Sequence, residues 1–249
     1  MRVYQFRHAR ERREEITLPP SWQTNFDFLS TFFVAQCPHM KVLITAGPTR
    51  EPIDPARYLT NRSSGRMGYA LAAAAAKRGH SVLLISGPTS LELPDGVDYL
   101  PIETAADMYQ AVESQIGRMD IAIFAAAVAD YTPATISEQK IKKFGEELNL
   151  KLVKTKDILG SARSVMNFKG TLVGFAAETE NIEANARDKC LRKQCDLVIA
   201  NDISRRDIGF DSSENEVTLV YPDHSEALPQ DSKEHLAYHL IEIIEELRT

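Results

Sequence analysis

Cysteine is scarce in this chain of 249 residues, which contains only Cys37, Cys190 and Cys195. The number is odd, and no two of the three stand at the C-x-x-C spacing typical of zinc or redox sites. We therefore expect free thiols in a reducing cytoplasm rather than disulfides or a zinc centre.

Other absences narrow the class of protein further. Positive charge is not in excess, because the net charge is −6, whereas general nucleic-acid binding needs a basic face. No apolar run approaches the ~18 residues of a membrane span. Residues 41–249 contain no linker, repeat or low-complexity stretch. We expect one globular domain over 41–249, with neither a nucleic acid nor a membrane as its partner.

Residues 1–40 differ from the rest of the chain. Their acidic residues, such as Glu14 and Glu15, argue against a mitochondrial presequence, and they lack the apolar core of a secretory signal. We interpret 1–40 as an N-terminal extension. One hypothesis takes Met40 as the natural start, so that the preceding residues are not native; the other is an arm that packs on a partner subunit.

Strands and helices alternate from Lys41 onward. Apolar runs predict strands at 41–46, 81–86, 97–102 and 120–127, with helices at 65–78 and 105–116. Apolar strands between helices are typical of a parallel sheet covered on both faces. The pattern predicts an α/β fold, a Rossmann-like, doubly wound and mostly parallel sheet.

The second half adds a flap and a C-terminal hairpin. The alternation in 147–153 predicts a half-exposed strand, and buried strands are expected at 171–175 and 196–200, on either side of a helix at 182–193. A hairpin turning at Pro222-Asp223 and a last helix capped by Asp231 or Ser232 end the chain.

The segment 41–68 forms a predicted anion cradle. A strand ends at Gly47, and a long loop leads through Ser63 to Gly65 and Gly68 at the start of a helix. Free N–H groups and the positive end of the helix dipole favour a phosphate or carboxylate there. A nicotinamide dinucleotide site is disfavoured, because G-x-G-x-x-G does not follow the first strand and no acidic residue ends the second.

Two polar groups near this cradle suggest acyl transfer. Asn61 is either a helix cap or, since Ser63 and Ser64 already supply capping groups, an amide free to donate to an oxyanion. The flap carries Lys140-Ile141-Lys142-Lys143, which is either a solvated face or a cluster that gathers polyphosphate. The same alternatives hold for Lys189 and Lys193, which lie one turn apart on a helix.

Small and polar residues follow the predicted strand ends, where ligands bind in open α/β sheets. Together the motifs AGPTREPIDPARYLTNRSSGRMG, AAAVADY, KIKK, VGFAAET and DLVIAND resemble phosphopantothenoylcysteine synthetase, in order and in spacing. The resemblance covers 41–249 and points to the bacterial form, which is usually fused behind a flavin-dependent decarboxylase. No such half precedes it here, so the resemblance implies a stand-alone synthetase.

The resemblance implies a ligase that joins 4′-phosphopantothenate to L-cysteine in coenzyme A synthesis. Bacterial members activate the carboxylate with CTP as an acyl-cytidylate, and eukaryotic members use ATP. The resemblance further implies Mg²⁺ with the triphosphate, a cytoplasmic homodimer, and a flap that closes over a site near the partner subunit. The metal ligands stay unassigned.

Roles carry over from the resemblance residue by residue. Asn61 would bind the acyl-cytidylate and convert it, Lys140 would serve its formation, and Ala126 and Ala127 would contact pantothenate. The implied nucleotide-binding residues are Gly47, Ser63, Gly65, Gly68, Asp130, Lys140, Asp157, Ile158, Phe175, Lys189, Lys193 and Asn201. Where the bacterial pattern reads Asn-Pro-Asp-Ile, this chain has Thr155-Lys156-Asp157-Ile158, which leaves the choice between CTP and ATP open.

Overall fold

The computed structural model describes residues 39–143, 145–202 and 214–248, and the structural statements below concern these residues. Of the predicted extension, only His39 and Met40 fall within the described residues, so the domain division at residue 40 stays a prediction. Met40 is buried against the sheet.

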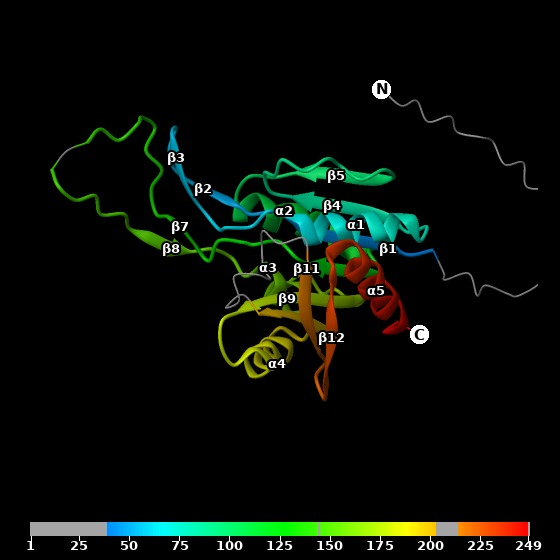
Figure 1. Cartoon of the computed structure of the whole chain (residues 1–249). Coiled ribbons are helices and arrows are strands. Elements are labelled where there is room, and N and C mark those ends of the chain that lie inside the picture. The colour runs from blue at the N-terminus through cyan, green and yellow to red at the C-terminus, as the bar shows by residue number, and fades with distance from the viewer. Residues whose placement is uncertain (1–38, 144, 203–213, 249) are drawn as a thin grey trace, which may run out of the picture. The chain divides into compact units, whose positions relative to one another are not determined.

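An eight-stranded sheet forms the centre of the fold, in the order β12-β11-β10-β9-β6-β1-β4-β5 (Figure 1). All neighbours from β10 to β5 are parallel, and β11 and β12 are antiparallel. The Rossmann-like, mostly parallel sheet with a C-terminal hairpin is thus confirmed. The two outer strands, β5 and β12, each contain a proline, Pro101 and Pro229. The strands are β1 Lys41–Ala46, β4 Ser81–Ser86, β5 Val97–Pro101, β6 Ile121–Phe124, β9 Thr171–Glu178, β10 Leu197–Asp202, β11 Glu214–Val220 and β12 Ser225–Ser232.

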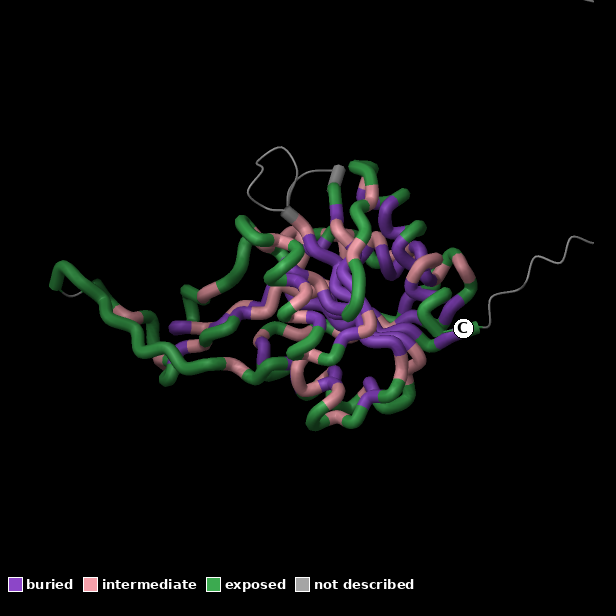
Figure 2. Tube along the Cα trace, turned by 90° about the horizontal axis from the view of Figure 1, so that it is seen from below, coloured by how far each residue is buried: buried purple, intermediate pink, exposed green. Residues whose placement is uncertain are grey.

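Helices cover both faces of this sheet. Buried side chains of α1 and α5 share one apolar cluster with Val42 and Ile44, while those of α2, α3 and α4 share another with Leu43. This alternation along β1 follows from the two-residue period of a strand. The buried core runs through the sheet in Figure 2. The helices are α1 Arg66–Lys77, α2 Ala105–Gln115, α3 Ile158–Ser164, α4 Ile182–Lys193 and α5 Lys233–Glu246, with the short 3₁₀ helix Ile116–Arg118 after α2.

Helix α1 packs closely on the end of β1 because its residues are small. A Cβ built on Gly68 would lie 2.5 Å from the Cβ of Ala46, a distance that atoms do not tolerate. Any larger residue at position 68 would push the start of α1 away from the sheet. Glycine at this position therefore fixes where the helix begins relative to the strand end.

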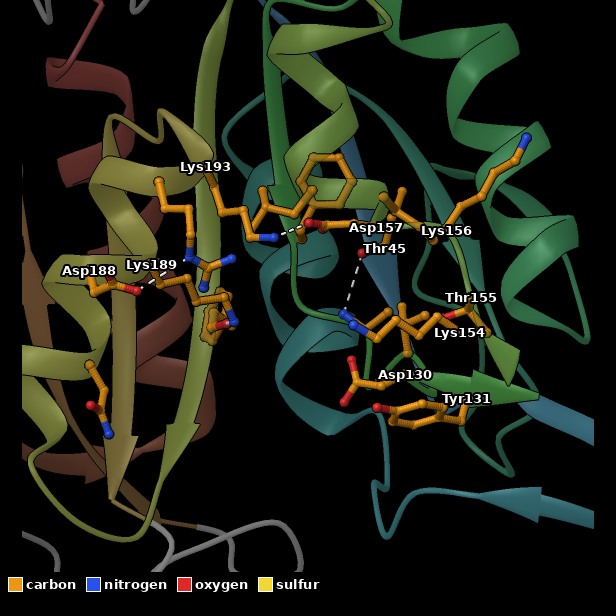
Figure 3. A pocket seen from close by; sticks show the side chains of 18 of the residues that line it. Thr45, Asp130, Tyr131, Lys154, Thr155, Lys156, Asp157, Asp188, Lys189 and Lys193 are labelled. Atoms are coloured by element: carbon orange, nitrogen blue, oxygen red, sulfur yellow. Dashed lines mark hydrogen bonds and ion pairs between the residues drawn. The ribbon is translucent and has the colours of Figure 1, made fainter. Parts of the chain in front are cut away.

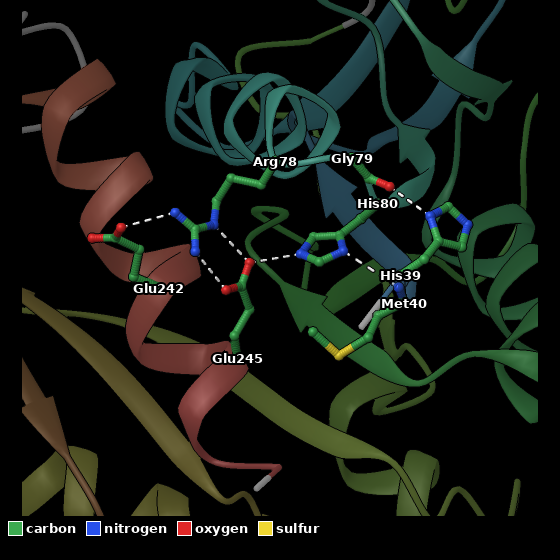
Figure 4. Close-up of polar contacts among 7 residues, drawn as sticks. All are labelled: His39, Met40, Arg78, Gly79, His80, Glu242 and Glu245. Carbon is green, nitrogen blue, oxygen red and sulfur yellow. Dashed lines mark hydrogen bonds and ion pairs between the residues drawn. The ribbon is translucent and has the colours of Figure 1, made fainter. Parts of the chain in front are cut away.

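A polar cluster fastens the other end of α1 to α5 (Figure 4). Arg78 donates to Glu245 through Nε and Nη2, at 2.7 Å each, and to Glu242 at 2.8 Å. His80 Nε2 lies 2.6 Å from Oε1 of Glu245, the oxygen that also accepts from Arg78 Nε, and His80 Nδ1 accepts from the Met40 N–H. The hydrogen bonds from Arg78 to Glu245 are charge-assisted, because a guanidinium meets a buried carboxylate. Hydrogen bonding to Glu245 raises the pKa of Arg78.

Two excursions leave the sheet on the same side in Figure 1. The first is the hairpin of β2, Arg50–Asp54, and β3, Arg57–Thr60. The second, here called the arm, comprises residues 131–154. It consists of β7, Tyr131–Pro133, the loop that carries Lys140, and β8, Leu152–Lys154. Figure 2 shows the arm as mostly exposed.

The structure corrects three local expectations. The segment 50–60, interpreted as a loop, is the β2–β3 hairpin. The strand predicted over 147–153 is wrong for most of its length, because only residues 152–154 pair, with β7; the alternation in 147–151 faces solvent on both sides. Helix α3 was not predicted; its N-cap Asp157 accepts from the Gly160 N–H at 2.9 Å.

Candidate active site

A cleft of about 780 Å³ opens at the carboxyl ends of β1, β6 and β9, beside α4 (Figure 3). Ligands bind at this edge in open α/β sheets. The cleft brings together seven residues of the predicted site, namely Ala126, Asp130, Asp157, Ile158, Phe175, Lys189 and Lys193. Its other lining residues were not predicted, and they include Thr45, Tyr131, Lys154, Glu178, Asn185 and Arg192.

Two lysines of α4 line one side of the cleft. Their spacing predicted only that they share one side of the helix. Lys189 Nζ donates to the Phe175 carbonyl at 2.5 Å, and Lys193 forms an ion pair with Asp157. Burial lowers the pKa of both lysines below the usual range, because desolvation disfavours the charged form. Lys193 is already paired with Asp157, whereas Lys189 donates to a neutral carbonyl, so an anionic ligand would offset the desolvation cost of Lys189.

The divergent segment Thr155-Lys156-Asp157-Ile158 keeps its two retained residues at the cleft. Lys156 reaches out over the Tyr109 ring, with its Nζ 4.3 Å from the ring centroid, and in Figure 3 its ammonium points away from Lys189 and Lys193. A cation–π contact of this kind holds the added charge on α2. The loss of the usual proline therefore leaves Asp157 and Ile158 in the cleft wall.

Threonine side chains hold the segment 125–130, which follows β6. Thr45 Oγ1 accepts from the Ala126 N–H at 3.3 Å, and Thr49 Oγ1 accepts from the Ala129 N–H at 3.0 Å. From the opposite side, Thr155 Oγ1 donates to the Ala129 carbonyl at 2.7 Å. Sequence reasoning missed these threonines, since each one bonds the backbone of a segment distant along the chain.

Asn61 lies against the same segment. Its Nδ2 donates to the carbonyls of Ala127, at 3.2 Å, and Val128, at 3.1 Å. These bonds do not cap a helix, which was one of the two predicted roles. The other prediction was an amide free to donate to an oxyanion, but here the amide nitrogen already donates to two backbone carbonyls. Since Val128 lines the cleft, Asn61 stands at the cleft edge beside Ala127.

The predicted cradle is built from close backbone contacts. Gly47 and Gly65 both have positive φ, +69° and +77°, and a Cβ on Gly65 would lie 3.2 Å from the Gly47 Cα. Gly65 is the N-cap of α1 and has no side chain to accept from the first-turn N–H groups. Ser63 Oγ instead accepts from the Gly65 N–H at 3.3 Å. The cradle joins the cleft segment through the bond from Ala127 N–H to the Gly47 carbonyl, 2.9 Å.

The turn after β4 packs directly on the turn after β1. A Cβ on Gly87 would lie 1.8 Å from the Pro48 carbonyl oxygen. A dinucleotide enzyme places its ribose-binding acid at the end of this second strand. Here the strand ends in Ser86-Gly87-Pro88, without an acidic residue, and the Gly87 backbone packs on Pro48.

The cleft lining does not include Asn61, Ala127 or the cradle residues Gly47, Ser63, Gly65 and Gly68. Two further predicted residues, Lys140 and Asn201, do not line it either. Lys140 lies in the arm, where it lines a separate hollow with Arg57, Lys142 and Lys143. Asn201 lies in β10, paired with Ala177 of β9, and its buried Oδ1 has no hydrogen-bond partner among the described residues. The single chain thus separates the flap lysine from the other predicted charges.

The described residues contain no group of three or more His, Cys, Asp or Glu side chains placed to hold a metal ion. Cys190 and Cys195 are buried free thiols, and burial raises the pKa of Cys195 to about 12. Among the helices that the structure describes, none is both long and apolar enough to span a membrane.

Comparison with known proteins places this geometry in context. The family model of the DNA/pantothenate metabolism flavoprotein C-terminal domain matches residues 37–247. The chain is 49% identical over 210 residues to the coenzyme A biosynthesis bifunctional protein CoaBC of Vibrio vulnificus strain YJ016, covering 84% of this chain and 52% of that protein. It therefore spans about half the length of the curated relatives it matches.

Two solved structures share the fold. The crystal structure of the C-terminal domain of coenzyme A biosynthesis bifunctional protein CoaBC is similar with a TM-score of 0.71 and 38% identity, covering 84% of this chain and 95% of that one. The DNA/pantothenate metabolism flavoprotein from Streptococcus pneumoniae gives a TM-score of 0.73 at 25% identity, covering 83% and 99%.

Proposed function

Because the chain belongs to the family of the DNA/pantothenate metabolism flavoprotein C-terminal domain, we propose that it is a phosphopantothenoylcysteine synthetase. It joins 4′-phosphopantothenate to L-cysteine in coenzyme A biosynthesis. CTP activates the carboxylate, an acyl-cytidylate is the intermediate, and pyrophosphate and CMP are released.

One observation carries this proposal. The Asn61 amide lies on the Ala127 and Val128 carbonyls, and Val128 belongs to the same cleft as Lys189 and Lys193. An amide suited to hold an acyl group therefore adjoins a wall of cations suited to hold a nucleotide. A ligase that passes through an acyl-nucleotide needs both groups at one site.

In the first step, a carboxylate oxygen of phosphopantothenate attacks the α-phosphorus of CTP, and the bond to pyrophosphate breaks. Two anions must approach each other, so cations and N–H donors have to offset their repulsion. Lys189, Lys193 and the start of α1 supply part of this charge. Lys140 supplies the rest when the arm meets the cleft.

In the second step, the cysteine amine attacks the acyl carbon, and CMP leaves with the electron pair of the broken acyl–phosphate bond. Negative charge develops on the acyl oxygen. Asn61 can donate to that oxygen if its Nδ2 exchanges a backbone carbonyl for the substrate. Preorganised donors of this kind act mainly on the transition state.

CTP is the proposed nucleotide. The support is the similarity to bacterial relatives and the retention of Asp157 and Ile158 in the cleft wall. Lys156, which replaces the usual proline, lies on Tyr109 and leaves that wall intact. ATP remains the alternative nucleotide within the same family.

Mg²⁺ fits this site as a companion of the triphosphate. It is commonly bound through one or two carboxylates, water and substrate phosphates, without an all-protein cage. Asp130 lines the cleft, and its carboxylate makes no hydrogen bond or ion pair within the described part of the chain. Asp130 would hold the ion, which would withdraw charge from the phosphate oxygens.

We also propose that the enzyme is a cytoplasmic homodimer formed through the arm. The arm exposes apolar side chains, including Tyr131, Ile136, Leu148 and Leu152, and exposed apolar patches mark interaction surfaces. A second copy would cover them and would bring Lys140 to a cleft. The buried free thiols suit a reducing compartment.

The test mixes the protein with 4′-phosphopantothenate, L-cysteine, Mg²⁺ and either CTP or ATP, and measures pyrophosphate. We expect release with CTP that requires phosphopantothenate, and much slower release with ATP. The variant Asn61→Asp should release pyrophosphate and accumulate the acyl-cytidylate. No release by the wild type with either nucleotide would remove the ligase proposal.

A further inference from the structure

A buried carboxylate outside the cleft is unusually well bonded. The side chain of Asp54, at the end of β2, has no exposed surface. Its Oδ1 accepts from the Ala56 N–H at 2.8 Å, and its Oδ2 accepts from Arg57 Nε at 3.0 Å and Arg57 Nη2 at 2.5 Å. Oδ2 also accepts from the N–H of Ile141, at 3.0 Å.

The last of these bonds reaches the arm. Ile141 follows Lys140 directly, and Arg57 Nη2 donates to the Ile141 carbonyl at 3.0 Å. Asp54 and Arg57 thus hold both backbone polar groups of one residue. On the other side of Lys140, the Ser137 N–H donates to the Ile53 carbonyl at 3.0 Å. The arm is therefore fastened to the β2–β3 hairpin on both sides of the lysine.

The contacts of Asp54 and Arg57 with the Ile141 backbone, here called the clamp, suit a Lys140 side chain that must stay available for a ligand. Arg57 neutralises the Asp54 charge locally, so the carboxylate does not need Lys140 as its partner. Hydrogen bonds from Arg57 outweigh the effect of burial and hold the pKa of Asp54 well below its usual range. A lowered pKa favours the ionised carboxylate, which is the form that accepts all of these hydrogen bonds.

We propose that Asp54 is a positioning residue for Lys140, acting through the Ile141 backbone to set where the flap lysine meets the nucleotide. The inference rests on the proposed function, which gives Lys140 its role. The simpler account is that Asp54 only closes the turn between β2 and β3, through Ala56 and Arg57. If that account holds, loss of the Asp54 carboxylate does not change the arm.

Asp54→Asn separates the two accounts, because an amide of the same size cannot accept from Arg57 and Ile141 with a full charge. The matched control is Asp95→Asn, since Asp95 is exposed in a turn.

The first readout is independent of activity: limited trypsin cleavage after Lys140, Lys142 and Lys143, compared with the melting temperature. We expect about tenfold faster cleavage at these three sites in Asp54→Asn, at an unchanged pattern elsewhere, and no change in the control.

The second readout is single-turnover formation of acyl-cytidylate. A displacement of about 1 Å costs on the order of 10²-fold, so we expect Asp54→Asn to lower the rate 10- to 100-fold at a nearly unchanged CTP KM. Wild-type rates of cleavage and of intermediate formation would overturn the proposal. A wild-type protein that releases no pyrophosphate would instead remove the proposed function, while cleavage would still test the clamp.

If Asp54→Asn fails to fold, Arg57→Lys decides. Lysine keeps the charge beside Asp54 but lacks the planar fork that reaches both the carboxylate and the Ile141 carbonyl. Faster cleavage confined to the arm supports the clamp. Cleavage at the wild-type rate contradicts it.

Discussion

The cleft and the arm place their functional groups by different means. The cleft is lined mainly by residues at the ends of buried strands and on α3 and α4, and Lys189 and Lys193 are fixed by a strand carbonyl and an ion pair. In the arm, Ile136 and Leu148 are each 54% exposed, and polar contacts to the β2–β3 hairpin hold Lys140. The cleft can thus be preformed by packing, while the position of Lys140 depends on a few polar contacts between the arm and the hairpin.

The strongest test of this division is Lys140→Gln. If the lysine acts only when the arm meets the bound triphosphate, the variant should bind CTP nearly as the wild type does but form the acyl-cytidylate 10²–10³-fold more slowly, as expected for loss of one transition-state donor. Rapid-quench assays and calorimetric CTP titration measure the two quantities. Lys143→Gln is the matched variant within the same lysine run, and an equal loss there would show that general charge, not position 140, matters.

The two regions should also differ in what they contribute to stability. Leu84 is fully buried in β4, so Leu84→Ala should lower the free energy of unfolding by about 2–5 kcal/mol. Leu150→Ala, in the arm, should change it by less than about 0.5 kcal/mol and weaken dimerisation instead. Urea unfolding and sedimentation distinguish these effects. A large stability loss in Leu150→Ala at low protein concentration would contradict an arm that is independent of the core.

The pH dependence of nucleotide binding should report the cleft. If Lys189 binds the triphosphate, as proposed, it does so as the cation, and burial lowers its pKa. Affinity for CTP should therefore fall as pH rises through this lowered pKa, before the ordinary lysine value of about 10.4 is reached. Lys189→Gln should weaken binding about tenfold at neutral pH and flatten this dependence. The exposed Lys77→Gln is the control, and an unchanged profile in Lys189→Gln would exclude Lys189 as the titrating group.

The smallest expected effect concerns the threonines around segment 125–130. Thr155→Val removes the hydroxyl that donates to the Ala129 carbonyl, which should cost about 1 kcal/mol, or roughly fivefold in KM for phosphopantothenate. Thr135→Val, at an exposed arm position, should have no effect. Steady-state kinetics of the two variants side by side are sufficient. Equal KM values would show that the backbone bonds alone hold the segment.

Much of the sheet was predictable because its strands are apolar on both faces. Residues 41–46 and 81–86 were predicted with their observed bounds, as was the helix 182–193. The β2–β3 hairpin was not, because Glu51 and Asp54 are buried there as charged groups. Glu51 accepts from the Ala105 N–H at the start of α2, at 2.8 Å, and no local pattern reveals that partner.

The site divides in the same way. The helical spacing of Lys189 and Lys193 sufficed to predict that both point to one side of α4. The contacts of Asn61, Thr49 and Asp54 did not follow from the sequence, because their partners are backbone groups 66, 80 and 87 residues away. A backbone donor or acceptor leaves no signature in the residue type that carries it.

The prolines in the two outer strands also bear on how this protein behaves when concentrated. Pro101 in β5 and Pro229 in β12 each remove an N–H from an edge of the sheet, and the acidic Asp98 and Glu226 stand on the same strands. Edges broken by proline and charge resist the addition of a foreign strand. Growth of the sheet from molecule to molecule, the first step towards fibrils, is thereby hindered at both margins.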